Sequence, residues 1–243
     1  MNKIIAVTSG KGGTGKSTFS VGLALALKKA EKGVLMIDMD SGLRCLDLLL
    51  GVDEKVVFDI SDALAGKPLD ACVLHSPRYL GVDLIPASIN EFCPSAEEFG
   101  NFVEKVSRLY DVVIIDFPSG SDFTLYSMLP RITEFVCVCN PNPVSVRDTA
   151  AVGSRLRAIG RAGRLVINKY DYYCLGNSVF KTLDDLIDIS GFKLLGIIPL
   201  SLKLEIAFYG GYFPLKGKEF KAYKRIAARL MGESVPIPKL SKI

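Results

Sequence analysis

Residues 10–17 read Gly-Lys-Gly-Gly-Thr-Gly-Lys-Ser and fit the phosphate-binding pattern G-x-x-x-x-G-K-[S/T]. An apolar run at 4–8 precedes the pattern and a helical pattern follows it, which is the strand–loop–helix context that the motif requires. Glycines let the backbone turn tightly and direct several N–H groups at one anion, and the helix N-terminus adds partial positive charge. The segment therefore predicts a phosphate site between the first strand and the first helix.

Lysine and serine at the end of this loop indicate a nucleotide with a divalent cation. Lys16 is expected to reach the β- and γ-phosphates, and the hydroxyl of Ser17 is expected to bind Mg²⁺. A simple glycine-rich turn would not explain why these two residues open a helix. We therefore expect the chain to bind ATP and Mg²⁺.

Short runs rich in Val, Ile and Leu recur along the chain and are apolar at consecutive positions, which is typical of strands covered on both faces of a parallel sheet. These runs lie at 4–8, 34–38, 82–86, 112–116, 135–139, 165–168 and 194–198. Helical periodicity appears between or after them at 19–30, 96–109, 145–159, 179–189 and 219–231. The alternation predicts an α/β fold: a doubly wound, mostly parallel sheet with helices on both faces.

Length and composition favour a single globular unit. The chain has 243 residues, of which 49% are hydrophobic and 23% are charged, values that argue against disorder. We expect a P-loop ATPase domain over residues 1–232 and a short C-terminal tail over 233–243. The formal net charge of +4 is too small to indicate a nucleic-acid-binding protein.

No segment has the pattern of a signal peptide or approaches the roughly 18 apolar residues of a membrane span. We therefore expect a cytoplasmic protein in which the six cysteines are free thiols. Cys137 and Cys139 lie within an apolar run, so for them core packing is favoured over metal binding.

Carboxylates follow two of the expected strands. Asp38 and Asp40 stand at the end of the run at 34–38, and Asp116 ends the run at 112–116. In open α/β sheets ligands bind beyond the carboxyl ends of the strands, so these groups are expected near the phosphates. Asp116 is expected to hold Mg²⁺ through its water shell, with Asp38 as a further metal candidate, and Asp38 or Asp40 could orient the attacking water. The alternative for each is a turn or helix cap.

Together these motifs resemble the MinD/ParA family of deviant Walker A ATPases. The string Lys-Gly-Gly-Thr-Gly-Lys-Ser-Thr at 11–18 is similar to the family signature, and the resemblance extends from residue 4 to about residue 232. Segments at 38–47, 56–60, 140–148 and 197–199 are similar to the MinD branch, whose members act in cell-division site selection. Cys45 departs from that pattern, which usually has Asn.

The resemblance implies roles for individual residues. Lys11 would reach across a dimer to the phosphates of the other subunit, and Asp40 is preferred over Asp38 as the water-positioning residue. The alternative for Lys11 is an ordinary solvated loop lysine. Asn168 would recognise adenine, and its alternative is a turn residue that ends a strand. The implied catalytic residues are Lys11, Lys16, Asp40 and Asp38. The implied nucleotide-binding residues are Gly10, Lys11, Gly12, Gly13, Thr14, Gly15, Lys16, Ser17, Thr18, Asn168 and Pro199.

The resemblance also implies partners. The ATP state would be a homodimer, a MinC-type inhibitor would act downstream, and a MinE-type activator would face the helix at 145–159 around Arg147 and Asp148. An ordinary solvated helix start is the alternative for that segment. Because no arginine finger is evident in cis, turnover is expected to be slow and stimulated by a partner, as a switch requires.

The end of the sequence departs from the MinD branch, whose members end in a membrane-binding amphipathic helix. Residues 234–243 contain two prolines and few apolar residues, so such a helix is not evident. A membrane surface is still a candidate partner. The protein could therefore also be located peripherally at the inner face of the cell membrane.

The alternative function is a ParA-type segregation ATPase whose ATP dimer binds DNA. Basic residues cluster near the end of the chain, but a solvated helix face is the favoured explanation for them and DNA binding is not expected. This cluster contains Lys216, Lys218, Lys221, Lys224, Arg225 and Arg229. An iron–sulfur branch of the family is disfavoured because the sequence has no Cys-x-x-Cys pair.

Overall fold

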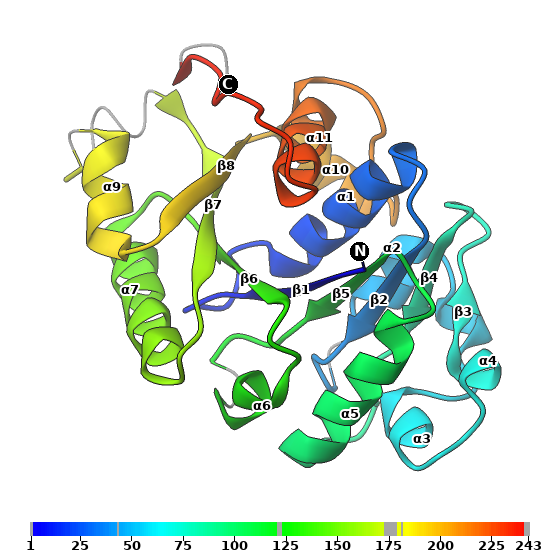
Figure 1. The fold of residues 1–243 in the computed structure, drawn as a ribbon. Coiled ribbons are helices and arrows are strands. Elements are labelled where there is room, and N and C mark those ends of the chain that lie inside the picture. Colours follow the sequence, from blue (N-terminus) through cyan, green and yellow to red (C-terminus); the bar gives the residue numbers. More distant parts are fainter. Residues whose placement is uncertain (1, 43, 121–122, 173–178, 181, 241–243) are drawn as a thin grey trace.

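The computed structural model describes residues 2–42, 44–120, 123–172, 179–180 and 182–240 (Figure 1). These residues form one eight-stranded sheet in the order β3-β4-β2-β5-β1-β6-β7-β8. Its strands are β1 (Lys3–Thr8), β2 (Val34–Asp38), β3 (Leu74–His75), β4 (Val82–Ile85), β5 (Val112–Asp116), β6 (Thr133–Cys139), β7 (Gly163–Tyr170) and β8 (Lys193–Pro199). All neighbours are parallel except β3 and β4. The mostly parallel sheet predicted from the sequence is confirmed.

Helices cover both faces of this sheet (Figure 1). One hydrophobic cluster packs α1 and α11 against it, and the other packs α5, α6, α7 and α9 against the opposite face. None of the described helices is long and apolar enough to cross a bilayer. The helices are α1 (Lys16–Lys29), α2 (Leu46–Leu50), the 3₁₀ turn η1 (Asp53–Lys55), α3 (Ile60–Leu64), α4 (Leu69–Cys72), α5 (Ala96–Ser107), α6 (Phe123–Met128), α7 (Pro143–Ala158), α9 (Leu183–Ser190), α10 (Leu202–Tyr209) and α11 (Lys218–Leu230).

Two of the predicted boundaries, in α9 and β7, differ from the observed ones. The helix predicted at 179–189 begins only at Leu183, because Thr182 and Asp185 form a capping box that fixes the start of α9. The strand predicted at 165–168 is longer, since β7 runs from Gly163 to Tyr170. Asn168 therefore lies inside a strand and does not end one.

The register of the sheet brings the ends of three strands together. Asp38 is the last residue of β2 and pairs with Asp116, the last residue of β5. Val7 of β1 also pairs with Asp116. The loop that follows β1 therefore begins beside both carboxyl groups, as the strand-end argument predicted.

Helices α5 and α6 approach each other closely at Gly100. A Cβ atom added there would lie 2.4 Å from the carbonyl oxygen of Met128, a backbone atom that cannot swing aside. Phe99 and Val103, on either side of Gly100 in α5, are fully buried in the core cluster that α6 also joins. Glycine at this position thus sets the spacing of the layer that covers β5.

Replacing Gly100 by valine should therefore lower the free energy of unfolding by about 2–3 kcal/mol, because the added methyl groups overpack the α5–α6 contact. Asn101→Val is a matched control, since Asn101 is the next residue of the same helix and is exposed; its effect should stay within about 0.5 kcal/mol. Urea unfolding of both variants measures the difference. Equal stability of the two variants would show that the close approach does not constrain the layer.

Candidate nucleotide-binding site

The loop between β1 and α1 needs its glycines for two separate reasons. Gly13 and Gly15 have φ angles of 75° and 89°, in the left-handed region that disfavours other residues. At Gly10 an added Cβ atom would lie 2.3 Å from the carbonyl carbon of Asp148, because the start of α7 packs directly on the loop. The backbone N–H groups at the start of α1 are thus held in a tight turn, which suits an anion.

Lys16, Ser17 and Asp116 come together at the beginning of α1. Lys16 is only 8% exposed, and Ser17 and Ser20 donate hydrogen bonds to the carboxylate of Asp116, the second at 3.0 Å. Ser20 was not singled out from the sequence. Ser20 lies three residues after Ser17 and four after Lys16, so the three side chains share one side of the helix. This spacing is the sequence signal by which Ser20 could have been found.

The carboxyl groups of Asp38 and Asp116 are buried side by side with little compensating charge. Burial, and next the charge of Asp116, raise the pKa of Asp38 to about 8. Burial also raises the pKa of Asp116 to about 6, although hydrogen bonds from Ser17 and Ser20 and the charge of Lys16 oppose that rise. A divalent cation would supply the missing positive charge, so this donor set fits Mg²⁺.

The number of protein ligands also fits Mg²⁺. In the described part of the chain, no group of three His, Cys, Asp or Glu side chains is arranged to hold a metal by itself. Mg²⁺ usually takes one or two carboxylates and completes its shell with water and substrate phosphates.

The two cysteines Cys137 and Cys139 are fully buried in β6, and both belong to the same core cluster.

Asp40 lies just outside the buried pair. Its side chain is half-buried, and its backbone N–H donates to Oδ1 of Asp38 at 2.9 Å. Asp38 therefore stabilises a turn through this hydrogen bond and also lies beside Asp116. Asp40 is therefore more accessible to solvent than Asp38, which is 2% exposed.

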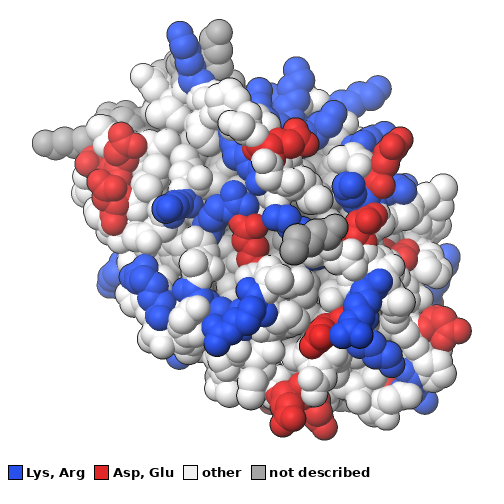
Figure 2. Space-filling model, viewed as in Figure 1, with Lys and Arg blue, Asp and Glu red and all other residues white. Residues whose placement is uncertain are grey.

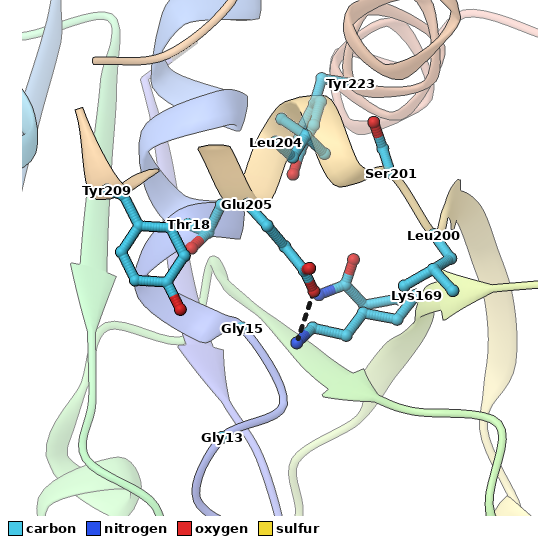
Figure 3. Close-up of a pocket in the computed structure, with 11 residues that line it drawn as sticks. Gly13, Gly15, Thr18, Lys169, Leu200, Ser201, Leu204, Glu205, Tyr209 and Tyr223 are labelled. Carbon is cyan, nitrogen blue, oxygen red and sulfur yellow. Dashed lines mark ion pairs between the residues drawn. The ribbon is translucent and has the colours of Figure 1, made fainter. Parts of the chain in front are cut away.

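A cavity of about 340 Å³ opens next to the loop (Figure 3). Asn168 is buried in its wall and donates from Nδ2 to the carbonyl oxygen of Thr14 at 2.8 Å. Lys169 and Glu205 form an ion pair of 3.7 Å, visible in Figure 3 as the dashed line between β7 and α10. The lining residues are Gly13, Gly15, Thr18, Asn168, Lys169, Leu200, Ser201, Leu204, Glu205, Tyr209 and Tyr223.

Apolar and aromatic walls with a few polar groups are typical of a small-ligand cavity, and an adenine base has that character. Thr18 and Asn168 line the cavity, whereas Pro199 does not; the next residues, Leu200 and Ser201, do. The contribution of α10 through Leu204 and Tyr209 could not be predicted, because no strand-end or glycine signal marks that helix.

The two loop lysines have opposite environments. Lys16 is buried, whereas Lys11 is exposed, and only the backbone carbonyl of Lys11 has a contact within the loop, from Ser9 Oγ at 2.8 Å. The side chain of Lys11 is thus accessible from outside the chain.

The burial of Asp38 leads to a stability prediction. Its folded-state pKa of about 8 lies above the ordinary value of 3.8, so between about pH 4 and pH 8 the folded state retains a proton that the unfolded state has released. This carboxyl therefore lowers stability progressively as the pH rises through that window. Asp38→Asn should raise the free energy of unfolding of the nucleotide-free protein by about 2 kcal/mol at pH 8, and by much less at pH 5.

Denaturant unfolding at the two pH values measures this effect. Asp53→Asn is the control, since Asp53 is exposed in η1 and its replacement should change stability by less than about 0.5 kcal/mol. A destabilised Asp38→Asn protein at pH 8 would contradict the assignment of unfavourable burial to this carboxyl.

Comparison with known proteins agrees with this geometry. A family model for the CobQ/CobB/MinD/ParA nucleotide binding domain matches residues 5–211. The septum site-determining protein MinD of Synechocystis sp. is 34% identical over 246 residues, covering 97% of this chain and 92% of that protein.

Solved structures give the same relationship. The MinC:MinD cell division protein complex of Aquifex aeolicus matches with a TM-score of 0.87 and 31% identity, covering 98% of both chains. MinD of Pyrococcus horikoshii complexed with Mg-ADP matches with a TM-score of 0.79 and 26% identity, covering 95% of this chain and 96% of that one. The chain therefore belongs to the CobQ/CobB/MinD/ParA family of nucleotide-binding proteins, as an ATPase of its MinD group.

Proposed function

We propose that this chain is an ATP-dependent dimerising switch that helps to select the site of cell division. The observation that carries the proposal is the contrast between its two loop lysines, of which Lys16 is buried at the phosphate loop and Lys11 is exposed. A single-subunit ATPase needs only the first of these. Relationship to septum site-determining proteins supports the cellular role.

Within one subunit the described side chains can bind and orient Mg-ATP. Lys16 would neutralise phosphate charge, Ser17 and Asp116 would hold Mg²⁺, and Asn168 would contact the adenine. When bound, the metal ion supplies positive charge against the negative charge of the transferred phosphoryl group. Asp40 orients the water that displaces ADP from the γ-phosphate.

Hydrolysis by one subunit should be slow. The phosphate loop at 10–18 contains no arginine, and no arginine finger in cis is evident from the sequence. An ATP state that persists is useful to a switch, because the partners must bind before hydrolysis ends it. The second subunit and an activator then supply what the single site lacks.

The dimer itself would be the active ATP state. Lys11 of each subunit is proposed to contact the phosphates bound by the other, so that ATP bridges two copies of the chain. The exposed position of the ammonium group supports this trans contact.

The Lys11→Ala variant should keep its affinity for ATP within a few-fold, since Lys16 and the loop backbone remain, but it should stay monomeric in Mg-ATP. Light scattering measures the mass, which for one chain is 26.4 kDa. Lys55→Ala removes an equally exposed lysine elsewhere and should dimerise as the unaltered protein does. A Lys11→Ala protein that still forms the ATP dimer would refute the trans contact.

Asp40→Ala should trap the ATP dimer, because the nucleotide and Mg²⁺ ligands remain while the water loses its orienting carboxylate. ATP turnover is expected to fall by roughly 10²–10⁴-fold, the usual contribution of a positioned acid–base group. Single-turnover hydrolysis and light scattering on the same sample test both parts. Normal turnover would reject Asp40 and shift the role to Asp38.

Partners follow from the relationship to MinD. We propose a MinC-type inhibitor as the downstream partner, which is consistent with the solved MinC:MinD complex of Aquifex aeolicus. A MinE-type activator would contact the start of α7, where the Arg147 side chain is 78% exposed. The location would be cytoplasmic and, in the ATP state, peripheral at the inner face of the cell membrane. The described residues after α11, up to residue 240, form no α-helix.

A ParA-type role is the second candidate, because α11 exposes Lys221 and Lys224 on the surface that faces away from the core. Its ATP dimer would bind DNA through the basic surface. The MinD relationship favours the first candidate, and co-sedimentation with duplex DNA in Mg-ATP and in Mg-ADP separates the two.

A further inference from the structure

Among the residues that line the nucleotide cavity, Tyr209 has an unusual exposure. It is the last residue of α10 and is 90% exposed, more than any other large hydrophobic side chain in the described part of the chain. Tyr223, which also lines the cavity, is 1% exposed and belongs to the core. The ring of Tyr209 therefore leaves its faces open to a ligand, whereas the ring of Tyr223 is covered by the fold itself.

Tyr209 and the end of β7 lie on opposite sides of the cavity. In Figure 3 the ring of Tyr209 stands across the cavity from Lys169 and Glu205, with Gly15 of the phosphate loop between them. Glu205 lies four residues before Tyr209, so both side chains project from one side of α10. A flat ligand that extends from the phosphate loop into the cavity would thus reach the ring of Tyr209.

An ion pair fixes the position of α10. Lys169 Nζ and Glu205 Oε1 are 3.7 Å apart, which ties the helix to the end of β7. Lys169 has a φ angle of 54°, an uncommon value for a residue with a side chain, and it lies within a register shift between β7 and β8. Backbone outliers of this kind persist where the surrounding structure requires them, and here the outlier carries one half of the pair. The helix, and with it Tyr209, is thus held in place before a nucleotide binds.

The most cationic surface of the molecule, by contrast, is already satisfied from within. In Figure 2, blue side chains gather over α7 and the neighbouring parts of β6 and β7. Arg157 and Arg161 donate to backbone carbonyls, and Arg164 is paired with Glu134. The ring of Tyr209 is instead left open by the residues around it.

We propose that Tyr209 stacks on the purine base of the bound nucleotide and that the Lys169–Glu205 pair positions α10 for this contact. Every base presents a π-face, and an aromatic side chain that stacks on it raises affinity by about tenfold. Leu200 and Leu204 add apolar surface to the same cavity. The inference rests on the proposed use of this cavity for the base, and it names the residue that covers the face of that base.

Stacking has consequences for selectivity. A purine covers more of an aromatic ring than a pyrimidine does, so the contact favours ATP over CTP or UTP. Adenine and guanine have ring systems of equal size, so Tyr209 does not separate them. ATP and ADP carry the same base, so Tyr209 contributes equally to the affinity for both, and recognition of the γ-phosphate is left to the phosphate loop.

Binding of Mg-ADP to the full chain tests the inference, since it needs neither hydrolysis nor the ATP dimer. Tyr209→Ala should bind Mg-ADP about tenfold more weakly in isothermal titration calorimetry. Tyr209→Phe keeps the ring and should bind within about twofold of the unaltered protein. Pyrophosphate has no base, so it should bind both variants as it binds the unaltered protein, and this binding also shows that the variants are folded.

Tyr212→Ala is the matched control, because Tyr212 is an exposed tyrosine just after α10 and is not among the described residues that line the cavity. It should bind Mg-ADP as the unaltered protein does. Equal Mg-ADP affinities of Tyr209→Ala and Tyr212→Ala would overturn the inference. An equal loss of pyrophosphate binding by Tyr209→Ala would also overturn it, because the change would then act on the phosphate loop.

The positioning role of the ion pair has its own test. Glu205→Gln should weaken Mg-ADP binding by about twofold to fivefold in the unaltered background, the range of an exposed pair. It should have no effect where Tyr209 is already alanine, because no ring is then left to position. Equal effects of Glu205→Gln in the two backgrounds would overturn the positioning role.

The same variants separate this contact from a contact with the second subunit. If Tyr209 touched a second copy of the chain instead, Tyr209→Ala would lose the ATP dimer at saturating Mg-ATP while it kept its affinity for Mg-ADP, and this outcome would overturn the inference. Failure of the proposed dimer would leave the Mg-ADP results unchanged, so the two proposals can fail separately.

Discussion

Two carboxyl groups, Asp38 and Asp116, end adjacent strands and are buried in direct register, and the rest of the nucleotide site is arranged around them. Their burial is unfavourable, as the raised pKa of each shows. The parallel sheet places both at the edge where the glycine-rich loop begins, and α1 brings Lys16 and Ser17 to the same point. A bound nucleotide with its metal ion would convert an unfavourable contact into a set of ligands, which couples ligand binding to stability.

The nucleotide site therefore depends on the order of the strands more than on any single helix. The parts that sequence reasoning found were those tied to this order: the fully apolar runs of β2 and β5 and the acids that end them. Loop glycines were equally readable, because Gly13 and Gly15 require positive φ angles. The parts that it missed lack a local signal. Helix α10 exposes apolar residues such as Ile206, so its pattern did not mark it as a wall of the cavity.

The molecule has two chemically different edges. The carboxyl edge holds the loop, the acids and the exposed Lys11, and is proposed to meet a second subunit across ATP. The amino edge has no such loop and instead carries a cavity lined by Arg157 and Lys193. Because the sheet separates the two edges, nucleotide and the proposed second subunit meet the carboxyl edge alone.

The central claim is that the hydrolytic site is composite and needs residues from two chains. The most direct measurement is the ATPase rate per chain as a function of protein concentration, at saturating Mg-ATP. A composite site predicts a rate per chain that rises with concentration and reaches a plateau once the dimer is fully formed. A rate per chain that is constant from the most dilute to the most concentrated sample would contradict the account.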